Sequence, residues 1–293
     1  MPNFPYNSNN VPRVSLGGFQ EKLCLCSKGT EISNGYIKNA SFELPSENEI
    51  STHIIKPQPK NAYQGLIESE AWAMASASFA ARCARVALIK LDNAPISLCV
   101  ERFDHCISNN GELIRIHQED CCQAMGLHPT EKYANDATIK GSDPSYKKIA
   151  DILKKYSKHP EEELFELLKQ VTVNLAMGNV DAHAKNYALL YKSLCVPELS
   201  PMYDIAPVSD VETGATHLSM RINNKIIAKE ITQNDLCKEA QSWGIPYEEA
   251  CSTINTTLNN LATGIASANT LYSEAAEKYS ASVGERISFL RSS

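Results

Sequence analysis

The stretch Gly178-Asn179-Val180-Asp181-Ala182-His183-Ala184-Lys185-Asn186 sets an acid and an amide five residues apart, and a second acid, Asp204, follows 18 residues after the amide. Metal-assisted phosphoryl transfer needs a carboxylate that orients and deprotonates a hydroxyl, together with oxygen ligands for Mg²⁺. Isolated Asp and Asn residues in loops are usually turn formers. Because His183 and Lys185 lie within the same set and apolar segments flank it, the pattern favours a phosphoryl-transfer site over an ordinary turn.

Composition limits the classes of protein that fit this chain. Its 293 residues are 43% hydrophobic and 21% charged, which suits one large domain or two lobes with a real core. The net charge of −6 argues against broad nucleic-acid binding through a basic surface. No run of 18 apolar residues predicts a membrane span. The polar stretch Met1 to Pro12 lacks the features of a Sec signal peptide, so we expect a cytoplasmic protein, with export by another signal left open.

Other metal chemistry has weaker support in the sequence. His183 leaves open an Asp-x-His metal centre of the hydrolase type, although no second histidine is clustered with it. The ten cysteines include a C-x-C pair, Cys24 and Cys26, but no C-x-x-C pair. We therefore expect most of the cysteines to be small buried hydrophobic residues in a reducing compartment.

The first hundred residues have mainly strand character. Strand patterns cover Glu21 to Cys26, Thr52 to Lys56 and Ile96 to Phe103, and the Asn34-Gly35 pair predicts a two-residue hairpin turn. The Ala- and Met-rich stretch Leu66 to Val86 contains no Gly or Pro and predicts one long helix.

The rest of the chain has mainly helical character. Helices are predicted over Glu119 to Met125, Ser145 to Tyr156 and Pro160 to Met177, the last with Gly178 as its C-terminal cap. Asn234 to Ser293 predicts two or three more, one of them starting at Pro246, while the polar stretch Tyr133 to Pro144 predicts a mobile loop. A small β-rich lobe followed by a larger helical lobe is an α+β architecture with a cleft between the lobes, and clefts hold ligands.

Three further segments could form a nucleotide site. Gly17 and Gly18 in Ser15 to Lys22 would let backbone N–H groups approach phosphates, although the segment is not a Walker A loop and could be a plain turn. Lys56 ends a strand, and the following helix supplies an acid to hold it, Glu68 or Glu70; the alternative is an exposed lysine. Glu101 to Asp104 leaves a strand and could present backbone groups to an adenine, or be a simple strand exit.

Taken in order, these pieces resemble the HipA family of bacterial serine/threonine kinases. The similarity spans residues 13 to about 207, and the order of the seven pieces makes it specific. The matching pieces are SLGGFQEK (Ser15 to Lys22), THIIKP (Thr52 to Pro57), ESE (Glu68 to Glu70), ERFD (Glu101 to Asp104), IHQED (Ile116 to Asp120), NVDAHAKN (Asn179 to Asn186) and LSPMYD (Leu199 to Asp204).

The resemblance implies a two-lobed protein-kinase-like fold, with residues 1–103 as the N-lobe and 104–293 as the helical C-lobe. It implies Asp181 as the catalytic aspartate on the substrate hydroxyl, Lys185 as a second catalytic residue, and Asn186 and Asp204 as ligands of Mg²⁺. The second substrate would be ATP. Its implied contacts are Gly17, Gly18, Phe19, Gln20, Glu21, Lys22, Lys56, Glu101, Arg102, Phe103, His183 and Tyr203.

The resemblance also bears on regulation. Ser15 matches the position whose autophosphorylation turns family members off. Only about 14 residues precede this loop, whereas full-length family members carry an N-terminal subdomain there, so the chain is most similar to the shortened HipT toxin kinases of three-part toxin–antitoxin systems. That similarity implies a small partner equivalent to the subdomain, and a DNA-binding antitoxin as a further partner.

Three functions therefore stay open at this point. The first is a toxin kinase that phosphorylates a protein, such as an aminoacyl-tRNA synthetase. The second is a phosphotransferase that acts on a small molecule or a lipid, since one fold can serve many acceptors. The third is a non-catalytic kinase-like binding module, which the presence of Lys56, Asp181, Asn186 and Asp204 disfavours.

Overall fold

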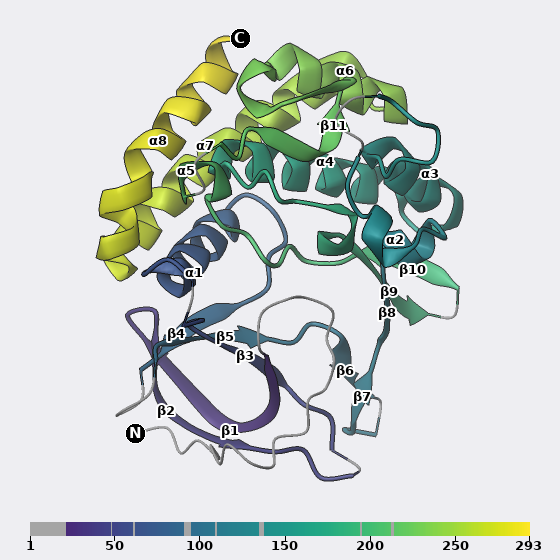
Figure 1. Cartoon of the computed structure of the whole chain (residues 1–293). Coiled ribbons are helices and arrows are strands. Elements are labelled where there is room, and N and C mark those ends of the chain that lie inside the picture. The colour runs from purple at the N-terminus through teal and green to yellow at the C-terminus, as the bar shows by residue number, and fades with distance from the viewer. Residues whose placement is uncertain are drawn as a thin grey trace.

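A β-barrel and a layer of helices make up the molecule, with one helix between them (Figure 1). The computed structural model describes residues 22–47, 49–60, 62–90, 95–108, 110–134, 138–193, 195–211 and 214–293. The mixture of helices and strands agrees with the α+β class expected from the sequence.

The N-terminal barrel is closed, with strand order β1-β2-β4-β5-β3. Asn34 and Gly35 join the first two strands with φ angles of 51° and 74°, the left-handed geometry that a two-residue hairpin requires, so the predicted turn is confirmed. Inside the barrel, Leu25, Phe42 and Ile55 belong to a small apolar core of their own. Its strands are β1 (Leu23–Ser33), β2 (Tyr36–Glu43), β3 (His53–Pro57), β4 (Val86–Ile89) and β5 (Ser97–Glu101).

Helix α1 (Leu66–Ala77) is shorter than predicted. The expected helix over Leu66 to Val86 is wrong beyond Ala77, because the chain turns after α1 and then pairs with another part of the chain at Cys83. There the Met202 N–H donates to the carbonyl of Arg82 and the Ala84 N–H donates to the carbonyl of Met202. These tertiary hydrogen bonds outweigh the helix propensity of an alanine-rich stretch.

The C-terminal part is mainly helical, as predicted. Ser145 caps α3 and Gly178 ends α4 with φ 72°, which confirms both ends predicted from the sequence. None of the described helices is long and apolar enough to cross a membrane. The helices of three or more turns are α3 (Tyr146–Tyr156), α4 (Pro160–Met177), α6 (Gln233–Trp243), α7 (Tyr247–Leu271) and α8 (Ser273–Ser292).

Short strands and helices lie between the N-terminal barrel and the long C-terminal helices in the chain or connect those helices. The helix predicted over Glu119 to Met125 is wrong at its start, because Glu119 and Asp120 pair with β9 in a strand, and only α2 (Cys121–Ala124) is helical. The strands are β6 (His105–Ile107), β7 (Leu113–Arg115), β8 (His117–Asp120), β9 (Ala188–Ser193), β10 (Val196–Leu199), β11 (His217–Ile222) and β12 (Lys225–Ile227). The remaining helices are η1 (Pro129–Glu131), η2 (Ala184–Asn186), α5 (Val208–Val211) and η3 (Ala228–Glu230).

Helix α1 is fastened to the helical part of the molecule. It packs on α7 and α8, and the indole N–H of Trp72 donates to the side-chain oxygen of Asn269 at 2.9 Å (Figure 1). A Cβ added to Gly264 of α7 would overlap the carbonyl oxygen of Ser76, so the two helices touch backbone to backbone there. The position of Glu70, which α1 directs toward the barrel, is therefore set by the packing of α1 on the C-terminal helices.

Candidate active site

The ammonium group of Lys56 lies between two carboxylates. Lys56 is 5% exposed on β3, and its Nζ donates to Oε1 of Glu70 at 2.5 Å and to Oδ1 of Asp204 at 2.7 Å. Burial alone would lower the pKa of Lys56, but the two carboxylates outweigh it and hold the pKa above its ordinary value. Of the two acids proposed for this lysine, Glu70 makes the contact, while the Oε2 atom of Glu68 is buried with no hydrogen-bond partner among the described residues.

Asp204 sits in an uncommon backbone conformation. Its φ is 61°, in the left-handed region that residues other than glycine rarely adopt, and such strain concentrates at functional sites. The Lys56 charge holds the pKa of its carboxyl below the usual range, against the effect of burial. The Asp204 side chain is 41% exposed, so its carboxylate is open to a ligand even while it contacts Lys56.

The loop from Asp181 to Asn186 is closed by its own backbone. The His183 N–H donates to the carbonyl of Asp181 at 2.7 Å, and the Asn186 N–H donates to the carbonyl of His183 at 2.8 Å. The Asn186 side chain uses its Nδ2 as a donor to the Asp181 carbonyl at 3.3 Å, which leaves its Oδ1 as an acceptor. The Asp181 side chain is exposed, as a residue that meets a substrate must be.

The donor set suits a hard cation. The Oδ1 atom of Asn186 and the exposed carboxylate of Asp204 are oxygen ligands of the kind that Mg²⁺ prefers. Within the described ranges no three His, Cys, Asp or Glu residues cluster in a way that would hold a metal ion. Mg²⁺ generally takes only one or two protein ligands and completes its shell with phosphate and water, so two such oxygens would be enough to hold it.

Lys185 is held by a neighbour that the sequence analysis had not assigned a role. Its Nζ donates to Oδ2 of Asp120 at 2.5 Å, and Asp120 is also the N-terminal cap of α2. The Lys185 carbonyl accepts a hydrogen bond from the hydroxyl of Tyr203 at 2.8 Å. Tyr203, which the sequence predicts to contact ATP, therefore holds the backbone of the loop. The structure therefore places the Lys185 ammonium group on Asp120.

His183 is buried behind the loop. It is 7% exposed, and its Nδ1 has no hydrogen-bond partner among the described residues. Burial lowers the pKa of the imidazole, and the charges of Asp181 and Asp204 oppose this only in part. A neutral ring at physiological pH follows.

The strand exit after β5 is largely engaged within the protein. The backbone N–H groups of Glu101 and Arg102 donate to the carbonyls of Arg85 and Thr52. The Arg102 guanidinium makes two hydrogen bonds to the Asp104 carboxylate, at 2.8 and 2.5 Å. The Phe103 ring lies 5.8 Å from the ring of Tyr203, centroid to centroid, so Phe103 links this exit to the segment before Asp204.

The Arg102–Asp104 pair gives stability a predictable pH dependence. Burial opposes ionisation of Asp104, but Arg102 and Arg115 outweigh it and hold its pKa below the usual value. A depressed pKa stabilises the fold above the unfolded value of about 3.9 and loses that effect as the pH falls through the folded pKa. We expect Asp104→Asn to lower the free energy of unfolding by about 1.5–3 kcal/mol at pH 7. The difference in this free energy between the variant and the original chain should shrink at pH 3. Urea titrations at both pH values measure it.

The matched control for that experiment is Asp151→Asn. Asp151 pairs with Lys147 on the surface of α3, where both side chains are 53% exposed. Exposed pairs of this kind contribute little, so the control should change stability only slightly at either pH. If Asp104→Asn lowers the free energy of unfolding equally at pH 7 and pH 3, the pH-dependent role of the Arg102–Asp104 pair is contradicted.

The proposed phosphate loop falls largely outside the described residues. This holds for Ser15 and for Gly17, Gly18, Phe19, Gln20 and Glu21. Lys22 is described, and burial lowers its pKa, with the nearby positive charge of Lys56 acting in the same direction. Lys22 therefore lies within electrostatic reach of Lys56 and Asp204.

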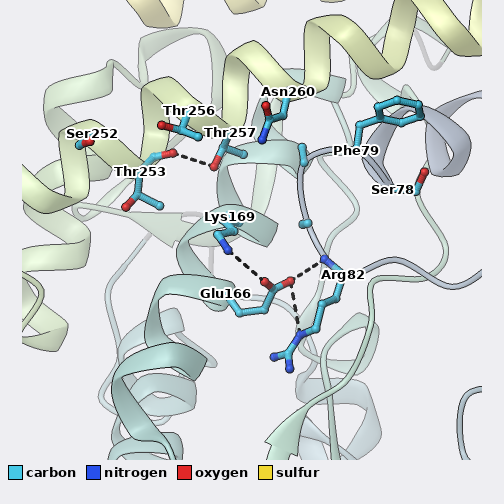
Figure 2. Close-up of a pocket in the computed structure, with 12 residues that line it drawn as sticks. Ser78, Phe79, Arg82, Glu166, Lys169, Ser252, Thr253, Thr256, Thr257 and Asn260 are labelled. Carbon is cyan, nitrogen blue, oxygen red and sulfur yellow. Dashed lines mark hydrogen bonds and ion pairs between the residues drawn. The ribbon is translucent and has the colours of Figure 1, made fainter.

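A hollow of about 440 Å³ lies away from these residues, between α4, α7 and the segment after α1 (Figure 2). Figure 2 shows Glu166 between the two cations of the hollow, Arg82 and Lys169, and Arg82 also pairs with Glu163. Its positive charges are thus already neutralised, which makes it a poor phosphate site. None of the candidate catalytic or nucleotide residues lines it.

Comparison with known proteins identifies the family. The model of the HipA-like C-terminal domain matches residues 14–265. The chain belongs to that family. Y4mE of Sinorhizobium fredii, named as a candidate kinase, is 32% identical over 247 residues, which are 81% of this chain and 51% of that protein. The serine/threonine-protein kinase toxin HipA of Shewanella oneidensis is 28% identical over 249 residues, which are 80% of this chain and 52% of that protein.

A solved structure shares the fold of this HipA-like chain. It contains Shewanella oneidensis HipA with HipB and operator DNA, and it matches with a TM-score of 0.76 at 23% identity, over 97% of this chain and 68% of the matched chain. The resemblance to the HipA family deduced from the sequence is thereby confirmed. This HipA-like chain spans about half the length of the curated relatives it matches.

Two contacts of the HipA-like site were absent from the sequence analysis. One is the ion pair of Asp120 with Lys185, for which the IHQED piece was the only signal. The other is a hydrogen bond from the hydroxyl of Tyr133 to the Asp181 carboxylate. Tyr133 stood at the start of a predicted mobile loop, and no local pattern distinguishes it from an ordinary loop tyrosine.

Proposed function

We propose that this HipA-like chain is an ATP- and Mg²⁺-dependent serine/threonine protein kinase that acts as a toxin. The observation that carries the proposal is the bridging position of Lys56 between Glu70 of α1 and Asp204. A buried lysine held by a helix acid, beside an exposed aspartate in strained backbone, is the arrangement that kinases use around nucleotide phosphates. In this proposal residues 1–103 form a kinase-like N-lobe and residues 104–293 the C-lobe.

The residues divide the reaction between them. An acceptor oxygen forms a bond to the γ-phosphorus of ATP as the bond to ADP breaks, and Asp181 accepts the proton of the acceptor hydroxyl. Lys56, kept charged by its carboxylates, binds the phosphates from the barrel side. Neutral His183 and the ring of Phe103 border the nucleotide. Asn186 and Asp204 would hold Mg²⁺, which when bound neutralises phosphate charge.

The proposal extends to acceptor, partners and location. The acceptor is a protein of the translation machinery such as an aminoacyl-tRNA synthetase, as the family resemblance implies, and Ser15 is a site of autophosphorylation. The partners are a DNA-binding antitoxin and a HipT-type small protein. Support for the antitoxin comes from the related HipA, whose solved structure contains HipB and operator DNA. The proposed location is the cytoplasm.

Labelled ATP tests the reaction directly. Purified chain, Mg²⁺ and γ-³²P-ATP are mixed with heat-treated bacterial lysate protein, and we expect label on serine or threonine of protein. Millimolar Mg-ATP should also raise the melting temperature, because a ligand that binds the native state stabilises it. Label only in lipid or small metabolites would show a different phosphotransferase, and a thermal shift without any transfer would show a binding module. If no label is transferred and Mg-ATP causes no thermal shift, the proposal is contradicted.

A further inference from the structure

The hydroxyl of Tyr133 is bound to the proposed catalytic acid. It donates to Oδ1 of Asp181 at 3.0 Å, across 48 residues of sequence. A hydrogen bond to an ionised carboxylate is roughly twice as strong as one between neutral groups. The contact therefore restrains the χ2 torsion of Asp181, which in an aspartate is otherwise broadly distributed.

The backbone on both sides of Tyr133 is tied to the loop that carries Asp181. The carbonyl of Lys132 accepts from the N–H of Ala184 at 3.2 Å. On the other side, the Ala134 N–H donates to the carbonyl of Ser219 at 2.8 Å, and the Ser219 N–H donates to the carbonyl of Val180 at 2.9 Å. Tyr133 is thus fixed relative to Asp181 by two separate connections.

The ring of Tyr133 is held as well. It packs edge-on against the ring of His183, with centroids 5.3 Å apart and planes at 74°. The Lys132 ammonium group lies 4.7 Å from its centroid, a distance at which cation and ring attract each other. Tyr133 is 45% exposed, so its hydroxyl reaches Asp181 from the solvent side, where an acceptor must also enter.

We propose that Tyr133 is a positioning residue that orients the Asp181 carboxylate for the acceptor hydroxyl. The inference rests on the proposed kinase function. A carboxylate offers about four lone-pair sites, so one phenol on Oδ1 leaves Oδ2 for the acceptor. A gate over Asp181 would need a segment that can swing away, whereas residue 132 is bound to the loop itself and residue 134 is bound to Ser219 of β11. Correct orientation of a reacting group contributes strongly to rate.

Tyr133→Phe tests this because it keeps the ring contacts with His183 and Lys132 and removes only the hydroxyl. With γ-³²P-ATP and heat-treated lysate protein, we expect the initial rate at saturating ATP to fall by about 10- to 100-fold. The KM for ATP should stay within about two-fold, because Tyr133 acts on the acid and not on the nucleotide. The variant should melt at the temperature of the original chain.

Tyr156→Phe is the matched control. Tyr156 is 51% exposed and has Lys155 4.7 Å from its ring centroid, so it reproduces the surroundings of Tyr133 away from Asp181. Its rate should not change. In an Asp181→Asn background Tyr133→Phe should cause no further loss, since the two residues act as one unit.

The outcomes separate the inference from the function on which it rests. If Asp181→Asn abolishes transfer but Tyr133→Phe leaves it unchanged, the kinase proposal stands and the positioning role is wrong. A faster Tyr133→Phe enzyme would also overturn it, since the phenol would then compete with the acceptor. Equal transfer by the original chain and Asp181→Asn would overturn the kinase proposal, and the positioning role with it.

Discussion

Replacing Asp181 with asparagine should reduce phosphoryl transfer by about 10²- to 10⁴-fold, the usual contribution of a positioned general base. Asparagine keeps the size and one acceptor oxygen of the side chain but cannot take a proton. The backbone hydrogen bonds that close the loop use the Asp181 carbonyl and are unaffected. We therefore expect the same thermal shift with Mg-ATP as in the original chain, with transfer measured by γ-³²P-ATP under single-turnover conditions.

Two comparisons make the Asp181 result specific. Asp151→Asn changes an exposed aspartate on α3 that pairs with Lys147, and it should transfer phosphate at the original rate. Retained transfer by Asp181→Asn would remove this residue from the chemistry. Loss of both transfer and thermal shift would mean that the substitution had disturbed nucleotide binding instead of the acid.

Replacing Lys56 with methionine should be costly for stability as well as function. The change leaves Glu70, whose side chain is 5% exposed, without its cation. Removing one partner of a buried ion pair typically costs about 3–5 kcal/mol, because the other charge is left uncompensated. Urea unfolding at pH 7 should show that loss, and the thermal shift with Mg-ATP should disappear.

A second substitution separates the two effects of Lys56. In Lys56→Met with Glu70→Met, Asp204 also loses its cation, but its side chain is 41% exposed, and well-packed apolar replacements of a buried pair are often neutral. We expect most of the stability to return while the response to Mg-ATP stays lost. Lys192→Met is the surface control, since Lys192 is 53% exposed in its pair with Glu198. A Lys56→Met chain as stable as this control would refute the role of the pair.

The sequence is most predictive where structure depends on neighbouring residues. The Asn34-Gly35 turn, the Ser145 cap of α3 and the Gly178 end of α4 follow from local backbone chemistry, and the structure has all three. The end of α1 could not be foreseen in this way. It depends on hydrogen bonds of Met202 with Arg82 and Ala84, which are distant from it in the chain.

In the candidate site, too, the sequence predicts the motifs but not the contacts between distant segments. The order of motifs placed Lys56, Asp181 and Asp204 in one family pattern, but spacing alone left Glu68 and Glu70 equal as partners of the lysine. Only the packing of α1 decides for Glu70, because it turns that carboxylate toward β3. The contact between Tyr133 and Asp181 joins segments with no common motif, so folding alone reveals it.

The close approach of Gly264 to α1 affects how the two parts of the molecule can move. The chain passes from the barrel into α1 and back again, yet α1 packs closely on α7, with backbone contact at Gly264 and a hydrogen bond from Trp72 to Asn269. Lys56 belongs to the barrel and Glu70 to α1, so their ion pair joins the barrel to this helix. Lys56 also contacts Asp204 of the C-terminal part, so a rotation of the barrel over the helices would stretch both ion pairs. In the proposed kinase, a nucleotide bound at Lys56 would therefore act on the same contacts that join the barrel to the helical part.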